Sequence, residues 1–364
     1  MAVMAATADP APLDLAVVAR DRFPDVRGHL DSATTGVPPL AAVRAARAAI
    51  ADWEQGRVDA RRLDEDVERS RAAFARILGV PTDEIACGSQ VSVFAGLVAA
   101  SLPTGAEILV AAGDFTSVLF PMLAQQARGV RVRETTLERL PEGIDGRTTL
   151  VAVSAVQSAD GRVADLERLS AAAEHHGVDV FLDVTQAAGW LPIDGRRFTY
   201  VCGGAYKWLL SPRGTALMRV APEAGERLIP HTAGWYSAAD PWSACYGGPL
   251  RLPGTAKRFD VSPAWTCWAG TAPALELIDE LGAERIGAYD RALAERLREG
   301  LGLPRSESAI VSVAASADAP ERPDAEARLR AAGVRAAVRA GRVRLACHLP
   351  ATVEDVDRAV AALS

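Results

Sequence analysis

The sequence predicts an α/β protein with a mainly parallel, seven-stranded sheet, followed by a smaller C-terminal α+β domain. Between Ile85 and Val220, short apolar runs alternate with Ala-, Leu- and Arg-rich stretches of helical period. Continuous apolar strands separated by helices are typical of a parallel sheet covered on both faces. After Pro230 the alternation ends, and the region Trp235–Trp268, rich in Gly, Pro and Trp, is predicted to be a loop.

The strands of the large sheet are expected where these short apolar runs lie. The seven runs are Ile85–Cys87, Glu107–Ala112, Val130–Thr136, Leu150–Val156, Val178–Val184, Tyr200–Gly204 and Thr215–Val220. The helices expected between the earlier strands are Val91–Ala100, Val118–Arg128 and Leu166–His176. Only Ala205–Gly214 separates the last two strands, and no clear crossover helix fits there. The seventh strand is therefore predicted to be antiparallel.

The C-terminal domain is expected to mix helices and strands. The expected elements are helices Ala272–Leu281, Ala283–Gly300, Ala325–Ala332 and Val353–Leu363, and strands Ile310–Ala315 and Arg342–Cys347. Thr352 is a suitable N-cap for the last helix, with Asp355 in its first turn. The predicted organisation is an N-terminal segment at 1–27, a large domain at 28–261 and a small domain at 262–364.

Composition excludes several classes of function. The 364 residues include 40 Lys and Arg against 46 Asp and Glu, a net charge of −6, which argues against non-specific nucleic-acid binding. The cysteines are odd in number, and no pair has CxxC spacing, so neither a zinc site nor a disulfide framework is expected. These five cysteines are Cys87, Cys202, Cys245, Cys267 and Cys347. A reducing, cytoplasmic location and no bound metal are predicted.

Membrane association is not expected. No apolar run reaches the roughly 18–20 residues that a membrane-spanning helix needs. The stretch Met1–Leu15 is rich in Ala and Pro and lacks a basic segment followed by an apolar one, so no signal peptide is predicted.

Polar side chains follow several of the expected strands, where a parallel sheet binds its ligands. Ser89 and Gln90 follow the first strand and open a helix, whose free N–H groups and positive dipole end favour a phosphate. An ordinary N-cap serine is the alternative explanation for Ser89. No GxGxxG and no GxxxxGK[ST] motif is present, so neither a dinucleotide fold nor a P-loop has positive support.

Two charged residues add a specific chemistry to this edge. Asp183 ends an apolar strand and needs a cationic or hydrogen-bonding partner, such as a protonated pyridine nitrogen; capping of the next turn is the alternative. Lys207 lies between glycines and aromatic residues in a chain with few lysines, which favours a neutral amine able to form a Schiff base. A surface lysine with its stem on apolar groups is the alternative. A phosphate cradle, a pyridinium partner and a Schiff-base lysine are together what pyridoxal phosphate requires, and Phe115 could stack on its ring.

The motifs around these residues resemble the class V aminotransferase family of fold-type I pyridoxal-phosphate enzymes. The matching segments are Phe181–Gly189, Ala205–Gly214, His29–Ala33, Phe259–Pro263, Val343–His348 and Thr352–Asp357. They span nearly the whole chain in the expected order, and the block containing Asp183, Gln186 and Lys207 is the specific one.

The resemblance implies a role for each matching residue. Lys207 would hold the cofactor and move the α-proton, Asp183 would pair with the ring nitrogen, and Gln186 would hydrogen-bond the ring hydroxyl. Ser89, Gln90 and Tyr206 would bind the phosphate, and Trp235 would also contact the cofactor. Ser262 would contact the phosphate of the cofactor bound in the neighbouring subunit. Arg344 would bind the substrate carboxylate, a bidentate task suited to a guanidinium. A homodimer with composite sites is implied.

The departures from the family's branches narrow the expected activity. The stretch Ala325–Arg342 lacks the nucleophilic cysteine of cysteine desulfurases, and Cys347 falls in a strand-like run, so a standard cysteine desulfurase is not expected. Gln186 and Pro263 differ from the kynureninase residues. Lys207–Leu209 followed by Pro212–Gly214 is closest to the isopenicillin N epimerase branch.

The predicted function is that of an aminotransferase or C–X lyase acting at Cα or Cβ of an amino acid. An amino-acid epimerase is the alternative within the family, and a non-catalytic pyridoxal-phosphate-binding partner protein is the alternative outside enzymes. The substrate side chain is not identified by the sequence.

Overall fold

The computed structural model describes Leu15 and residues 21–314 and 324–364. The expected N-terminal segment, and with it the prediction that no signal peptide is present, lies mostly outside the described residues. Ala315, the last residue of one expected strand, also lies outside them.

The large sheet has the seven strands that the sequence predicts. They are β1 (Ile85–Gly88), β2 (Glu107–Ala111), β3 (Arg131–Thr135), β4 (Thr148–Ser154), β5 (Asp179–Asp183), β6 (Tyr200–Gly204) and β7 (Ala216–Val220). Their order across the sheet is β1-β7-β6-β5-β4-β2-β3. β7 is antiparallel to both of its neighbours, and the other pairs are parallel, which confirms the predicted direction of the seventh strand.

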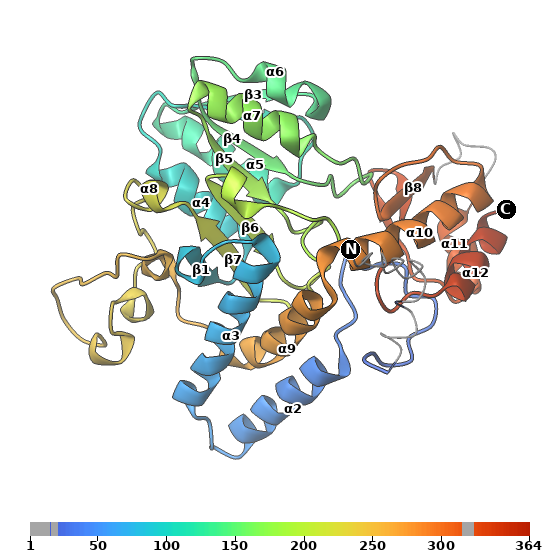
Figure 1. The fold of residues 1–364 in the computed structure, drawn as a ribbon, viewed down its shortest axis with the longest axis horizontal. Coiled ribbons are helices and arrows are strands. Elements are labelled where there is room, and N and C mark those ends of the chain that lie inside the picture. The colour runs from blue at the N-terminus through green and yellow to red at the C-terminus, as the bar shows by residue number, and fades with distance from the viewer. Residues whose placement is uncertain (1–14, 16–20, 315–323) are drawn as a thin grey trace, which may run out of the picture.

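Helices cover both faces of this sheet (Figure 1). Alternate strand residues enter different cores: Ile108 and Val110 pack with α4 (Val91–Ser101) and α5 (Thr116–Leu123), whereas Leu109 and Ala111 belong to the core on the other face. That second core includes residues of α3 (Ala60–Leu78), α7 (Leu166–His176), α9 (Trp265–Leu281) and α10 (Ala283–Leu301). Burial on both faces explains why the strands read as continuous apolar runs.

Two N-terminal helices lie where no element was assigned from the sequence. They are α2 (Leu40–Glu54) and α3, which begins after the N-cap Asp59 and ends at Gly79 in the left-handed conformation. Both helices pack against α9. In Figure 1 the three form a group at the lower edge of the molecule, so segments far apart in the sequence make one layer.

The start of α9 corrects the predicted loop Trp235–Trp268. The helix begins at Trp265, seven residues before the expected start at Ala272, and Trp268 is buried within it. The Trp-rich sequence has weak helical propensity, but packing against α2 and α3 supplies the stability that local sequence does not.

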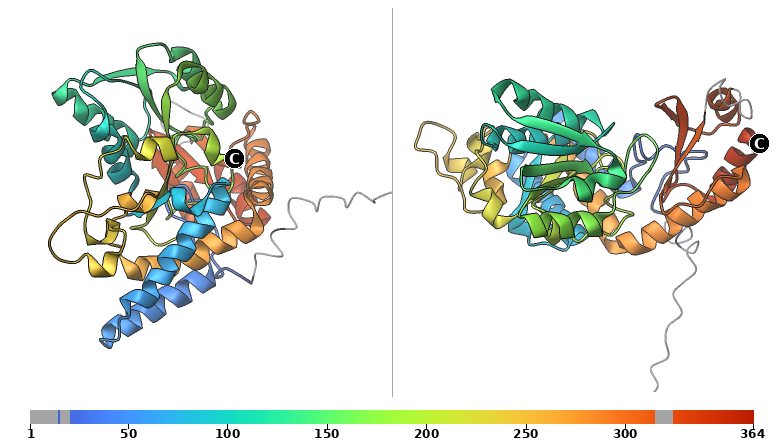
Figure 2. Two further views of the ribbon diagram at one scale, coloured as in Figure 1. Left: turned by 60° about the vertical axis from the view of Figure 1, so that its left-hand side comes forward. Right: turned by 90° about the horizontal axis from the view of Figure 1, so that it is seen from above.

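The C-terminal sheet is small and antiparallel, with the order β8-β10-β9. Its strands are β8 (Ile310–Ala314), β9 (Ala337–Arg339), which was not predicted, and β10 (Arg342–Ala346). Helix α10 runs from the large sheet toward these strands, which lie beside α11 (Ala325–Ala331) and α12 (Val353–Leu363) (Figure 2). Asp355 donates its backbone N–H to the Thr352 hydroxyl, which confirms the predicted N-cap of α12.

Residues 28–31 join the chain's beginning to the C-terminal sheet. Leu30 donates its N–H to the Arg335 carbonyl at 3.1 Å and accepts the N–H of Ala346 at 2.7 Å. The Gly28 N–H is bound by the Asp355 carboxylate. This segment therefore lies between the small sheet and the large one.

The remaining helices are short. They are the α-helical turns α6 (Leu140–Gly143) and α8 (Pro222–Gly225) and the 3₁₀ turns η2 (Thr82–Glu84), η3 (Ala124–Arg128), η4 (Leu137–Arg139), η5 (Gly195–Arg197), η6 (Trp235–Ser237), η7 (Pro241–Ser243) and η8 (Ala256–Phe259). None of the helices in the described ranges has the length and apolar character needed to span a membrane.

Candidate functional site

The carboxyl ends of β1, β2, β4, β5 and β6 surround an open pocket of about 680 Å³. The lining residues are Ser89, Gln90, Val91, Phe115, Ser117, Ser154, Ser158, Asp183, Thr185, Gln186, Gly204, Tyr206, Lys207, Arg213 and Gly214. The structure thus brings together Ser89, Gln90, Phe115, Asp183, Gln186, Tyr206 and Lys207, as the sequence predicts.

The Lys207 amine is buried in this pocket without a carboxylate partner. The residue is 5% exposed, and its Nζ lies 5.3 Å from the Phe115 ring centroid and 5.6 Å from that of Tyr206. Within the described part of the chain, Nζ makes no ion pair. Burial lowers the pKa of Lys207 to about 8, and the positive charges of Arg344, Arg339 and Arg213 add to that effect. The neutral amine that a nucleophile requires is therefore more populated near neutral pH than that of an ordinary lysine.

The Asp183 carboxylate is also buried and lacks a cation at pairing distance among the described residues. It is 5% exposed and accepts the Thr185 N–H at 2.8 Å. Burial raises its pKa to about 6, while the Thr185 hydrogen bonds and the charge of Lys207 act in the opposite direction. A buried carboxylate is costly unless a cation meets it, and a protonated pyridine nitrogen entering the pocket would be such a cation.

The start of α4 provides the anion-binding end of the pocket. Its N-cap residue is Gln90, and no side chain caps this helix, so first-turn N–H groups remain open to a ligand. Ser89 and Val91 line the pocket beside it. A Cβ added to Gly88 would lie 2.8 Å from the Phe94 ring, so the turn between β1 and α4 has no room for a side chain there.

Gln186 is held in place by three hydrogen bonds. Its Nε2 donates to the Ala33 carbonyl at 3.0 Å and to the Ser158 hydroxyl at 3.1 Å, and its Oε1 accepts the indole N–H of Trp208 at 2.8 Å. Both amide hydrogens therefore already have acceptors. A ring hydroxyl reaches Gln186 either by donating to Oε1 or by displacing one of these acceptors.

Arg344 lies directly behind the pocket rather than in its lining. The side chain is 1% exposed; Nη1 donates to the Ser158 hydroxyl at 3.0 Å and Nη2 to the Thr34 hydroxyl at 2.7 Å. Burial lowers the pKa of Arg344 to about 10. Its Nε has no hydrogen-bond partner among the described residues. A carboxylate that replaced the Ser158 and Thr34 contacts would find a fixed guanidinium.

Trp235 and Ser262 are not among the lining residues. Trp235 packs against Trp242 and Trp265, with ring centroids 5.4 and 6.4 Å away. Ser262 follows Val261, whose N–H donates to the Cys87 carbonyl at 3.3 Å. Ser262 thus follows a residue that is bonded to the end of β1, but it lies outside the pocket of its own chain.

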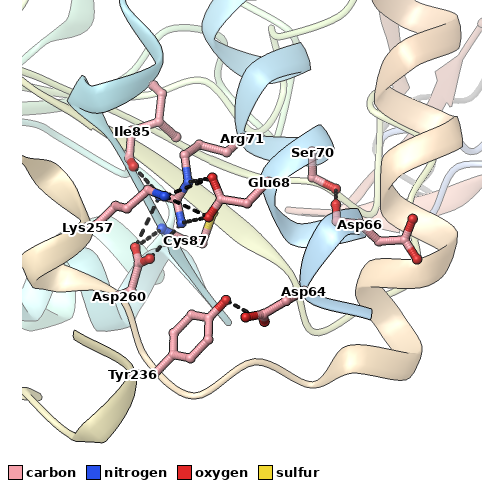
Figure 3. A network of polar contacts seen from close by, with 10 residues as sticks. All are labelled: Asp64, Asp66, Glu68, Ser70, Arg71, Ile85, Cys87, Tyr236, Lys257 and Asp260. Carbon is pink, nitrogen blue, oxygen red and sulfur yellow. Dashed lines mark hydrogen bonds and ion pairs between the residues drawn. The ribbon is translucent and has the colours of Figure 1, made fainter. Parts of the chain in front are cut away.

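A buried network fixes the outer edge of β1 just before the turn between β1 and α4 (Figure 3). Arg71 on α3 lies 2.6 Å from the Asp260 carboxylate and also donates to the Ile85 carbonyl. Asp260 accepts the Cys87 N–H at 2.7 Å. Because β1 is an edge strand, these side chains provide the hydrogen bonds that a further strand would otherwise supply.

Some residues of the site were not singled out as binding residues from the sequence. Ser158, Thr185 and Arg213 line the pocket, and Thr185 accepts the Gly204 N–H at 2.9 Å. Thr185 and Arg213 lie within the two motifs that carry the family resemblance, so a signal was available for them. Ser158 lies in the loop after β4, where no sequence pattern singles out one residue as a binding residue.

The comparisons with known proteins agree with this site. The family model of aminotransferase class-V matches residues 29–320. The chain belongs to this family of pyridoxal-phosphate enzymes, and pyridoxal 5'-phosphate is its cofactor.

Two relatives show the spread of activities within the family. An uncharacterized aminotransferase, YcbU of Bacillus subtilis (strain 168), is 26% identical over 311 residues, covering 81% of this chain and 82% of the relative. The isopenicillin N epimerase of Streptomyces clavuligerus is 27% identical over 257 residues, covering 63% of each chain.

Solved structures share the fold. The cysteine desulfurase CsdA of Escherichia coli superposes with a TM-score of 0.81 at 22% identity, covering 95% of this chain and 97% of that one. The cystine C–S lyase C-DES, solved with its product cysteine persulfide, gives 0.81 at 23% identity, covering 93% and 97%. At these identities the likeness establishes the fold and not the reaction.

Proposed function

We propose that this protein is a pyridoxal-phosphate enzyme acting at Cα or Cβ of an amino acid, as an aminotransferase or a C–X lyase, with Lys207 as the catalytic residue. One observation carries the proposal. The pocket holds a buried amine and a buried carboxylate, Lys207 and Asp183, and neither has an ionic partner among the described residues. Such a pair is costly by itself and is explained by a ligand with an aldehyde and a basic ring nitrogen.

Each residue has a defined task in this proposal. The bound cofactor supplies an aldehyde and an electron-withdrawing ring. Lys207 would hold the cofactor covalently through Nζ and would carry a proton to or from the substrate. Asp183 would keep a proton on the ring nitrogen. Ser89, Gln90 and Tyr206 bind the phosphate, and Arg344 orients the substrate carboxylate.

The proposal excludes the persulfide-forming mechanism of cysteine desulfurases, although CsdA shares the fold. The described stretch Ala325–Arg342 contains no cysteine. Cys347 is fully buried, and burial raises its pKa far above that of a reactive thiol. A desulfurase assay with cysteine tests this exclusion: sustained sulfide release that depends on Cys347 would contradict it.

The decisive experiment uses the purified holoprotein. Reduction with borohydride should fix the pyridoxyl group on the peptide containing Lys207 and not on that containing Lys257, the chain's other lysine. A panel of amino acids without keto acid then separates the reactions. Stoichiometric conversion to the pyridoxamine form identifies an aminotransferase, whereas catalytic consumption of the amino acid identifies a lyase.

Epimerisation is the second candidate, supported by the 27% identity to isopenicillin N epimerase. It predicts inversion at Cα, read by chiral chromatography, with solvent deuterium incorporated and no loss of amino acid. If Lys207 binds the cofactor and no amino acid changes the spectrum, the protein is instead a non-catalytic cofactor-binding partner.

We also propose that the protein works as a homodimer in the cytoplasm. Several large apolar side chains are exposed, among them Trp53, Phe120, Tyr246 and Leu250, and a second copy would cover them. The placement of Ser262 and Trp235 outside their own pocket fits a role in a partner's site. Sedimentation should give about twice 38.3 kDa; a 38.3 kDa species at working concentration would refute the dimer. All five cysteines are free, as a reducing compartment would have them.

A further inference from the structure

A buried, hydrogen-bonded pair of ionisable side chains lies behind the Lys207 turn, outside the pocket lining. His348 follows β10, Asp290 lies on α10, and both are fully buried. His348 Nδ1 lies 2.7 Å from the Asp290 carboxylate, and Nε2 lies 3.0 Å from the Trp208 carbonyl oxygen. Trp208 is the residue directly after Lys207, so the pair reaches the cofactor-linking segment from the C-terminal part of the fold.

The two partners fix which ring nitrogen of His348 carries a proton. The Trp208 carbonyl is only an acceptor, so Nε2 must be protonated to bond it. Both protonation states of Asp290 are compatible with a proton on Nε2. As a carboxylate, Asp290 accepts a hydrogen bond from Nδ1 of an imidazolium. As a carboxylic acid, it donates a hydrogen bond to Nδ1 of a neutral ring. In both cases the Nε2–H points at the carbonyl of Trp208.

Fold stability alone does not explain this pair. Burying two ionisable side chains away from water is expensive, and apolar residues of similar volume often serve a core equally well or better. The second carboxylate oxygen of Asp290 has no hydrogen-bond partner among the described residues, which adds to the cost. A buried pair with these costs requires another explanation.

Trp208, whose carbonyl is bonded to His348, is connected to the pocket. The His348 and Trp208 rings are in edge contact, with centroids 5.0 Å apart. The Trp208 indole donates to Gln186, whose side chain lines the pocket and is further bound to Ser158. A Cβ on Gly189 would lie 2.8 Å from the Trp208 oxygen, so this carbonyl is packed on a second side.

We propose that His348 and Asp290 are positioning residues: they fix the Trp208 carbonyl and indole, and thereby the backbone that carries Lys207 and the amide of Gln186. The inference rests on the proposed role of Lys207 in linking the cofactor. It assigns a task to two residues that touch neither substrate nor cofactor, and it couples the C-terminal part of the fold to the site.

The test uses the Lys257→Arg background, in which Lys207 is the chain's one lysine. In this background the double variant His348→Phe/Asp290→Leu removes the bond to Trp208 without leaving an unpaired charge. Asp290→Asn retains that bond, because its amide can donate to Nδ1 and leave the proton on Nε2. Tyr289→Phe is the matched control: it removes a buried hydrogen bond from α10 to the Ala351 carbonyl and does not touch Trp208.

Four quantities are measured for each protein. Two belong to the apoprotein, its melting temperature and the acylation rate of Lys207. Two belong to the holoprotein, the cofactor dissociation constant and the pH midpoint of the visible absorbance band. The double variant should bind cofactor at least ten-fold more weakly than the parent. The pH midpoint of its visible band and the acylation rate of Lys207 should also differ from those of the parent. Its melting temperature should fall no further than that of Tyr289→Phe. Asp290→Asn should stay within about three-fold of the parent.

Two results would overturn the inference. One is a double variant whose cofactor binding, band and acylation rate match the control. The other is Asp290→Asn losing as much as the double variant. Should the double variant not fold, Trp208→Phe decides: it loses the indole bond to Gln186 and should shift the visible band, and an unchanged band refutes the inference. A parent protein that never links cofactor at Lys207 would instead refute the proposed function.

Discussion

The guanidinium of Arg71 and the carboxylate of Asp260 lie 2.6 Å apart in the core, and together they hold the edge strand β1 through Ile85 and Cys87. In Figure 3 the Arg71 side chain reaches from α3 toward Asp260 and the strand. Gly88 and the phosphate-binding residues follow at once. Asp260, which lies 173 residues downstream of Cys87 in the chain, thus helps to hold the strand end that precedes the proposed phosphate-binding residues.

Breaking this pair should destabilise the protein strongly. Asp260→Asn removes the buried counterion of Arg71 and leaves only the half-exposed Glu68 beside its guanidinium, and we expect a loss of about 3–5 kcal/mol in the free energy of unfolding. The double variant Arg71→Met/Asp260→Leu should recover most of that loss because no charge remains buried. Urea unfolding of the apoproteins measures both. The exposed pair Arg296–Asp357 is the control, and its removal should leave the free energy of unfolding nearly unchanged because solvent screens it.

Replacement of Lys207 should abolish the covalent cofactor link while the fold is retained. Lys207→Ala removes the amine that bonds the aldehyde, so the visible absorbance of the linked cofactor should disappear. Lys257→Ala is the matched control, because that lysine is partly exposed and paired with Glu68. An unchanged cofactor spectrum in Lys207→Ala would exclude the assignment, whatever the activity of the variant.

The reactivity of Lys207 should depend on pH with a low midpoint. Burial lowers its pKa to about 8, so the neutral amine accumulates as pH rises through 8. In the Lys257→Arg apoprotein, the rate of Lys207 acylation should rise with pH to a plateau, with its midpoint near 8. Peptide mapping separates this signal from the N-terminus. A midpoint above 10, as in a model peptide, would show that the amine is solvated.

Asp183→Asn should stabilise the apoprotein and weaken cofactor binding. The Asp183 pKa is about 6 in the folded chain and 3.8 in the reference state, so the unfolded state loses its proton first. Stability is therefore lost as pH rises from about 4 to 6, by up to about 3 kcal/mol. Asparagine does not titrate and so avoids this loss. The increase in the free energy of unfolding of Asp183→Asn, measured with urea, should therefore be present at pH 7.5 and small at pH 4. A gain of equal size at both pH values would contradict the argument.

Arg344 should act on substrate and not on cofactor. Arg344→Gln removes the charge behind Ser158, and we expect binding of an amino-acid carboxylate to weaken by 10- to 100-fold, about 1.5–3 kcal/mol. The cofactor dissociation constant should change less than two-fold. Arg342→Gln, on the same strand and exposed beside Ser312, is the control. Equal weakening by the two variants would remove Arg344 from the site.

The large sheet could be predicted because its strands are buried on both faces and are therefore apolar throughout. The edge strand β3, with Arg131 and Glu134 exposed, was still found from its place in the alternation. The small strand β9 and helices α2 and α3 were not assigned. β9 has only three residues, which is too short for a hydrophobic period.

Within the site, sequence placed a residue in the pocket where a single side chain at the end of a single strand supplies the chemistry. Asp183, Lys207 and Ser89 were found in this way, since topology brings the carboxyl ends of parallel strands to one edge. Ser158 was missed, because its hydrogen bonds to Gln186 and Arg344 join three distant segments.

The sequence by itself determined the α/β architecture, the cofactor class and most of the pocket residues that we propose to contact the cofactor, because each depends on local periodicity or on a motif of adjacent residues. Only the tertiary structure decided how those residues are held. Arg71 with Asp260, and His348 with Asp290, are paired across 189 and 58 positions of sequence. Their roles arise from burial and from unmet backbone hydrogen bonds, which exist only after the chain has folded.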